Sequence, residues 1–212
     1  MSNLPLVITI SRQLGSGGAF LGQQLAEQLG ILYLDRQIVI NAAKELNVLE
    51  QELESRDEKK TSVWNSMLQS FACHPSGIYY APPEICIPSD LELYKAESEF
   101  IQEVAKKHSA VIIGRGGSYL LRDHPRHFSV FLHADPAFRQ QRVEELYKLS
   151  PPEAKKLILR SDQERADYLK ALTGQNWLDA SKYHLAFDTS AIGFSQAKEI
   201  IVSCVQSRFG RV

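Results

Sequence analysis

The sequence has few of the features that mark secreted or membrane proteins. Its three cysteines, Cys73, Cys86 and Cys204, are odd in number and scattered, which argues against a disulfide framework. No apolar run approaches the roughly 18 residues needed to span a bilayer, and no basic segment precedes a long apolar one at the N terminus. We therefore predict a cytoplasmic protein that does not engage a membrane.

A large charge excess is also absent. With a formal net charge of -1, the protein has no overall basic field that would draw it to nucleic acid. A chain of 212 residues, of which 44% are hydrophobic and 23% charged, suits one sizeable globular domain. The sequence shows no internal repeat, so we predict a single domain over residues 1–212.

Five short apolar segments alternate with helical patterns along the chain. They cover residues 7–10, 31–34, 110–113, 128–132 and 184–187. Helix-start signals occur between them, at Asp135 followed by Pro136 and at Ser150 followed by Glu153. Such alternation predicts βαβ units, and hence an α/β fold with a parallel sheet covered on both faces.

One stretch, residues 55–89, interrupts this alternation. It opens with a charge run and contains four prolines, Pro75, Pro82, Pro83 and Pro88. A connection of this length inside a compact domain is usually functional or disordered.

A glycine cluster, Gly15-Ser16-Gly17-Gly18, follows the first predicted strand and opens a helix. In parallel sheets, ligands bind beyond the carboxyl ends of the strands. Glycine lets the backbone approach a phosphate, and the helix N terminus offers free N–H groups. The sequence therefore predicts that these four residues bind a nucleotide phosphate, although the glycines also suit a plain strand-to-helix turn.

The cluster departs from the P-loop pattern, which is a glycine, four residues and then Gly-Lys-Ser/Thr. If Gly17 is the last loop glycine, Arg12 stands in place of the first glycine, Gly18 in place of the lysine and Ala19 in place of the magnesium-binding hydroxyl. In a kinase, another group must then supply the charge that the lysine brings to the β- and γ-phosphates.

A dinucleotide-binding interpretation also has partial support. Gly15, Gly17 and Asp35 match half of that fingerprint, but Phe20 stands where its third glycine belongs. An oxidoreductase would also leave the arginines further along the chain without a role, so we disfavour this interpretation.

Longer segments share one resemblance. It rests on Ser11-Arg12-Gln13-Leu14-Gly15-Ser16-Gly17-Gly18, Tyr33-Leu34-Asp35-Arg36, residues 111–117, residues 162–166, Asn176-Trp177, Tyr183-His184 and Asp188-Thr189. These segments resemble the cytidylate kinase-like family, bacterial relatives of cytidylate kinase with a Ser-Arg-x-x-Gly-Ser-Gly-Gly loop in place of Walker A. The resemblance covers nearly the whole chain except residues 55–88.

That resemblance implies a three-layer P-loop kinase fold with a five-stranded parallel sheet. It also implies an acceptor-binding insertion at about residues 36–100 and a helical lid at about residues 150–175. The expected activity is transfer of the terminal phosphoryl group of ATP to a nucleoside monophosphate, with a cytidylate-like acceptor favoured. The expected acceptor-binding residues are Asp35, Arg36, Arg115 and Asp162.

Arginines are the expected catalytic groups, because phosphoryl transfer needs positioning and positive charge more than a general base. Their forks bind phosphate oxygens in pairs and stay charged. We predict catalytic roles for Arg12, Arg142 and Arg165, with Arg12 supplying the charge that Gly18 cannot. ATP would come with Mg²⁺, held by Ser16, Ser11 or only by waters and phosphates.

Each of these residues also has a simpler interpretation. Arg12 could pair with a surface carboxylate, Asp35 could cap the next helix, and Asp162 could pair with Arg165 within one helix. A pair of helical arginines, Arg139 and Arg142, could present a solvated face. Arg115 could be a turn arginine facing water.

Two further functions stay open. Arg36, Gln37, Asn41 and Gly116 differ from the residues of true cytidylate kinases at the matching positions, so a kinase with a non-nucleotide acceptor is one alternative. A catalytically degenerate protein that only senses nucleotide is the other, because the lysine and the hydroxyl are missing.

Overall fold

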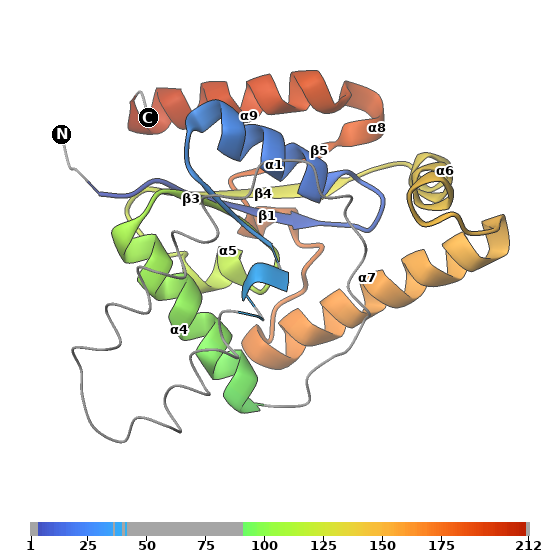
Figure 1. Cartoon of the computed structure of the whole chain (residues 1–212), viewed down its shortest axis with the longest axis horizontal. Coiled ribbons are helices and arrows are strands. Elements are labelled where there is room, and N and C mark those ends of the chain that lie inside the picture. Colours follow the sequence, from blue (N-terminus) through green and yellow to red (C-terminus); the bar gives the residue numbers. More distant parts are fainter. Residues whose placement is uncertain (1–3, 36, 40, 42–90, 211–212) are drawn as a thin grey trace.

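The structure is a computed structural model that describes residues 4–35, 37–39, 41 and 91–210 (Figure 1). Arg36, the interrupted stretch 55–89 and most of the predicted insertion at about 36–100 lie outside the described residues. Among the described ranges, no helix combines the length and the apolar character needed to cross a membrane.

A parallel sheet forms the centre of the molecule. Its strands are β1 (Val7–Arg12), β2 (Leu32–Leu34), β3 (Ala110–Ile113), β4 (His127–His133) and β5 (Leu185–Asp188). They lie in the order β2-β3-β1-β4-β5, and each neighbouring pair is parallel. This confirms the predicted five-stranded parallel sheet.

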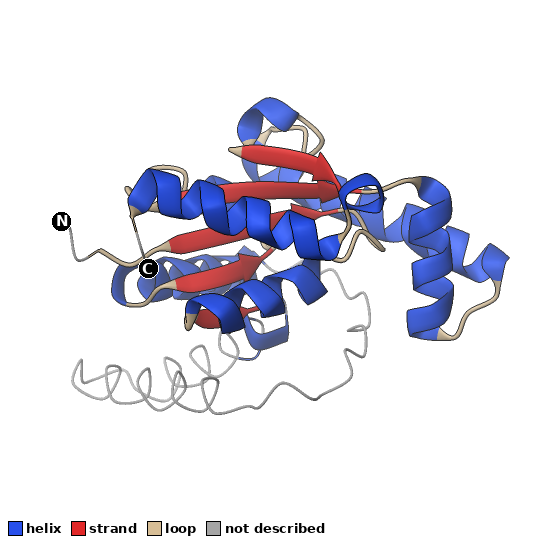
Figure 2. Cartoon of the chain, turned by 90° about the horizontal axis from the view of Figure 1, so that it is seen from above, coloured by secondary structure: helices blue, strands red, loops and turns tan. Residues whose placement is uncertain are grey.

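Helices cover both faces of the sheet and complete three layers (Figure 1). The first face carries α1 (Gly18–Leu29) and α9 (Phe194–Phe209), and the second carries α4 (Leu91–Lys107), α5 (Gly117–Leu120) and α7 (Pro151–Thr173). Seen from above, α6 (Pro136–Tyr147) and the adjoining end of α7 extend past the sheet (Figure 2). The segment predicted as a lid, at about residues 150–175, forms the helix α7, and its role as a lid stays a prediction.

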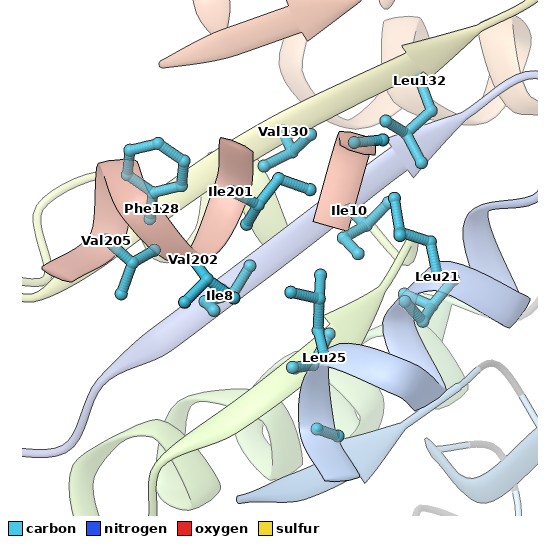
Figure 3. Close-up of a cluster of buried hydrophobic side chains, with 14 of the residues drawn as sticks. Ile8, Ile10, Leu21, Leu25, Phe128, Val130, Leu132, Ile201, Val202 and Val205 are labelled. Atoms are coloured by element: carbon cyan, nitrogen blue, oxygen red, sulfur yellow. The ribbon is translucent and has the colours of Figure 1, made fainter. Parts of the chain in front are cut away.

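The alternation of side chains along β1 divides the interior into two cores. Ile8 and Ile10 pack with Leu21 of α1 and Ile201 of α9 in the first core (Figure 3). Val7 points to the opposite face, where the second core gathers around α4. Burying each such aliphatic side chain contributes about 1.5–3 kcal/mol, so the two cores hold β1, and the loop that follows it, in place.

The predicted helix boundaries agree with the observed caps. Asp135 caps α6 by accepting hydrogen bonds from the N–H groups of Ala137 and Phe138. The Ser150–Glu153 capping box opens α7, as predicted. Three short elements were not predicted, because each is too brief to show a period: α5, the 3-10 turn Ala180–Lys182 and α8 (Thr189–Ile192).

Candidate active site

The loop between β1 and α1 lies at the carboxyl end of the central strand. Gly15 and Gly17 adopt left-handed backbone conformations, with φ of 87° and 82°. No side chain caps the N terminus of α1, and its first turn carries no acidic residue. The helix dipole and the backbone N–H groups at this end therefore suit an anion.

Hydroxyl groups on the interior side of the loop hold it in place through hydrogen bonds. Ser16 is fully buried, and its Oγ donates to the carbonyl oxygens of Gln13 at 2.9 Å and Leu132 at 3.2 Å. Thr189 Oγ1 in turn donates to the carbonyl of Ser16 at 2.9 Å. The hydroxyl of Ser16 thus faces the interior, where it does not fit the role of a magnesium ligand, and its contribution to a phosphate site would come from the backbone.

Two of the loop glycines lie so close to neighbouring helices that no larger side chain fits at their positions. A Cβ added at Gly15 would lie 2.7 Å from the carbonyl oxygen of Arg139, and one at Gly17 would collide with the ring of Phe194. Real Cβ atoms do not approach backbone so closely, so any larger residue would push α6 or α9 away from the loop.

Arg12 lies directly over Gly18. A Cβ added at Gly18 would lie 2.6 Å from Arg12 Cγ and 2.9 Å from Arg12 Cβ. The guanidinium continues to the end of β3, where a Cβ on Gly114 would collide with its Nη1. In the part of the chain that the structure describes, no Asp or Glu forms an ion pair with Arg12. The side chain therefore crosses the carboxyl ends of two adjacent strands, next to the predicted phosphate loop.

A second group of charges ties the loop to α6 and α7. The N–H of Leu14 donates to Asp162 Oδ1 at 2.9 Å, and Arg139 Nε donates to the carbonyl of Leu14 at 2.7 Å. Arg139 Nη2 also bonds to Asp162 Oδ2, and Arg165 Nη1 lies 3.3 Å from Asp162 Oδ1. The intrahelical Asp162–Arg165 pair is therefore present, within a larger network that reaches the loop.

Arg142 faces aromatic rings. Its guanidinium carbon lies 4.5 Å from the ring centroid of Phe194 and 5.7 Å from that of Phe20. Burial lowers the pKa of Arg142 from its usual value, and the nearby Glu145 opposes that effect only in part. Arg139 is buried and Arg142 is half-buried, so the two arginines do not form a solvated face.

Arg115 is buried at the end of β3 with a positive φ of 53°. It forms an ion pair with Glu97 of α4, and its guanidinium carbon lies 4.6 Å from the ring centroid of Tyr168 on α7. The side chains of Arg115 and Glu97 are 7% and 1% exposed, so Arg115 is not a turn arginine facing water. Arg115 therefore connects the end of β3 to α4 and α7.

Asp35 lies at the end of β2, where its Oδ1 accepts hydrogen bonds from the N–H groups of Gln37 at 3.0 Å and Ile38 at 3.1 Å. The capping role that the sequence left open is therefore present. The next residue, Arg36, lies outside the described residues.

Four residues around the site were not assigned a role from sequence: Glu97, Tyr168, Thr189 and Phe194. Thr189 belongs to a segment that carried the family resemblance, and Glu97 is a buried acid on α4. The partners of Arg115 and Gly17 come from distant segments, so no local spacing pointed to them. Among the described residues, no group of three or more His, Cys, Asp or Glu is placed to hold a metal ion.

The fold and the loop together define a P-loop-type kinase architecture. Two solved structures with this architecture are a shikimate kinase from Bacteroides thetaiotaomicron, with 13% identity and a TM-score of 0.50 over 95% of this chain and 98% of that one, and a gluconokinase from Sinorhizobium meliloti, with 12% identity and a TM-score of 0.50 over 97% and 94%. At these identities the likeness concerns the fold alone.

The chain belongs to the cytidylate kinase-like family, whose sequence model matches residues 7–191. An uncharacterized protein from Eubacterium ventriosum has 20% identity and a TM-score of 0.72, over 96% of this chain and 99% of that one. A search of curated proteins finds no match.

Proposed function

We propose that the protein is a phosphotransferase that moves the terminal phosphoryl group of ATP to a small acceptor, with a cytidylate-like nucleoside monophosphate as the first candidate. The observation that carries the proposal is the position of Arg12 over Gly18. A permanently charged fork takes the place of the lysine side chain that this loop lacks.

The reaction needs little covalent help from the protein. An oxygen of the acceptor phosphate attacks the γ-phosphorus of ATP, the bond from that phosphorus to the β–γ bridging oxygen breaks, and ADP leaves with the electron pair. The loop backbone and the N terminus of α1 would hold the β-phosphate, and Arg12 would offset the charge on the transferred group. We propose Arg165, the most exposed arginine of the Asp162 network at 26%, as the second mobile charge.

The acceptor site is the less defined part of the proposal. Arg115 and Asp162, both expected to bind the acceptor, already pair with Glu97 and Arg139. Asp35 caps a helix through one carboxylate oxygen. Because these three side chains already have partners within the protein, the first assay should use a broad panel of acceptors, including a non-nucleotide alcohol.

Magnesium is expected with ATP, but the described residues do not offer a ready site for it. Ser16 directs its hydroxyl into the interior. Burial raises the pKa of Tyr183, and the neighbouring Ser11 lowers it in part. We therefore propose no protein ligand for the metal. The roles proposed for the arginines do not depend on it.

A coupled ADP-release assay with ATP, magnesium and each of CMP, dCMP, UMP, AMP and a non-nucleotide alcohol tests the proposal. Arg165→Ala should lose turnover, whereas Arg160→Ala, an exposed arginine on the same helix, should keep it. Turnover with one monophosphate that is lost only in the first variant would support a nucleotide kinase. No turnover despite measurable ATP binding would favour a different acceptor or a nucleotide sensor.

A further inference from the structure

We propose that Asp162 is a positioning residue that holds the phosphate loop in its binding shape and connects it to Arg165. This inference rests on the proposed function for its purpose, but it concerns contacts that are present without any ligand. It differs from the acceptor-binding role that the family resemblance implied for Asp162.

Leu14 is held by two helices that are distant in sequence. Both polar groups of its backbone are bound by side chains from distant helices: Asp162 accepts from its N–H at 2.9 Å, and Arg139 donates to its carbonyl at 2.7 Å. These partners lie 148 and 125 residues away along the chain. The residue directly before Gly15 is therefore fixed by α6 and α7, and not only by its own turn.

The carboxylate of Asp162 is bound by groups of the protein through both of its oxygens. Asp162 Oδ1 accepts from Leu14 and Arg165, and Oδ2 accepts from Arg139, so both oxygens are engaged by the protein. A free carboxylate facing an acceptor phosphate would repel it, since both are negative. Here the two guanidinium groups and one carboxylate leave a net charge of about +1 near the loop, which suits a phosphate.

The two arginines that bind Asp162 differ in exposure. Arg139 bonds the loop and Asp162 together, and its side chain is 8% exposed. Arg165 is 26% exposed and makes the longest of the hydrogen bonds to Asp162, at 3.3 Å. Arg165 can therefore exchange its carboxylate for a substrate phosphate while Arg139 and Asp162 keep the loop in place.

The test uses hydrogen exchange of the full-length protein without nucleotide, followed by titration with inorganic tripolyphosphate. Removal of a hydrogen-bond acceptor with a full charge changes such equilibria by about 10- to 100-fold. We expect Asp162→Ala to speed exchange at Leu14 and the following loop amides by that factor, and to weaken tripolyphosphate binding by a similar one. Asp162→Asn should retain part of the exchange protection, because an amide oxygen can still accept from Leu14.

Two controls separate positioning from other effects. Asp167→Asn removes an exposed carboxylate on the same helix and should change neither measurement. Arg165→Ala should leave loop exchange unchanged, because the loop bonds run through Asp162 and Arg139.

The outcomes distinguish this inference from the proposed function. Unchanged loop exchange in folded Asp162→Ala, or in Asp162→Asn if the alanine variant does not fold, would overturn the positioning role. Faster exchange in a protein that binds no tripolyphosphate would support the positioning role while counting against the phosphate site. In an active protein, positioning further predicts that Asp162→Asn raises KM for ATP more than it lowers kcat.

Discussion

The side chain of Arg12 fills the space that a side chain at position 18 would need. Arg12 leaves the last position of β1, and its Cβ and Cγ pass within 2.9 Å and 2.6 Å of where a Gly18 Cβ would lie. A lysine at position 18 and an arginine at position 12 in this conformation are therefore mutually exclusive. In this loop, which lacks the lysine, the side chain of Arg12 fills the space beside position 18.

This exclusion predicts a double-mutant cycle in stability. Gly18→Ala alone should destabilise the protein by about 1–3 kcal/mol, because the added methyl group collides with Arg12 near the backbone, where the arginine cannot easily move. In an Arg12→Ala background the same change should be neutral or stabilise by up to about 1 kcal/mol, since alanine is the better helix former.

Urea unfolding of the four proteins measures the cycle. Equal effects of Gly18→Ala in both backgrounds would mean that the two side chains do not compete for one space.

The buried Glu97–Arg115 pair predicts a large loss of stability when one partner is removed. Glu97→Ala should destabilise the protein by about 3–5 kcal/mol, because it removes one partner of a buried ion pair. Glu99→Ala, two residues away on the exposed side of α4, is the matched control and should cost less than about 1 kcal/mol. Chemical denaturation decides between these values, and a loss under 1 kcal/mol for Glu97→Ala would refute a buried, paired role for Glu97.

His127 predicts a loss of stability in mild acid. Burial, aided by the positive charges of His184, His124 and Arg208, lowers the pKa of His127 to about 3. The neutral ring stays bonded to Thr9 Oγ1 at 2.8 Å, while the unfolded chain takes up a proton below about pH 6.5. The folded state therefore loses stability as the pH falls from 6.5, by about 2 kcal/mol at pH 5 from this group.

Urea unfolding between pH 5 and pH 7 tests that prediction, with His127→Gln as the comparison. The variant should lose less stability than the wild type over this range, since it has no ring to protonate. Identical pH profiles for the two proteins would show that His127 is not the group responsible.

The sequence predicted the strands and the helix starts well, because each depends on a few residues that are neighbours in the sequence. Buried β-branched runs, Asp135 before Pro136 and the Ser150–Glu153 box each act within a few residues, and each was found where predicted. The glycines at 15, 17 and 18 were also recognised as a loop. Their neighbours were not, because Arg139, Phe194 and Arg12 meet them only once the sheet and the helices have packed.

The predicted site residues show the same division. Arg12 and Arg165 lie beside the loop network, as a phosphate site requires. Local spacing indicated the pair between Asp162 and Arg165, but not the pairing of Asp162 with Arg139 or of Arg115 with Glu97. A charged residue in a motif can bind a ligand or another side chain. Only the packed structure shows which charged group lies beside it. The roles of these residues in catalysis stay predictions.

The most direct test of the account is the dissociation constant for ATP of the Arg12 variants. Arg12→Ala should weaken ATP binding by about 10- to 100-fold, the effect of losing a charged hydrogen bond to phosphate. Arg12→Ala combined with Gly18→Lys should recover part of the affinity, because the lysine enters the vacated space. Arg122→Ala, an exposed arginine paired with Asp123, should bind ATP like the wild type. Wild-type affinity in Arg12→Ala would contradict the claim that Arg12 supplies the charge missing from position 18.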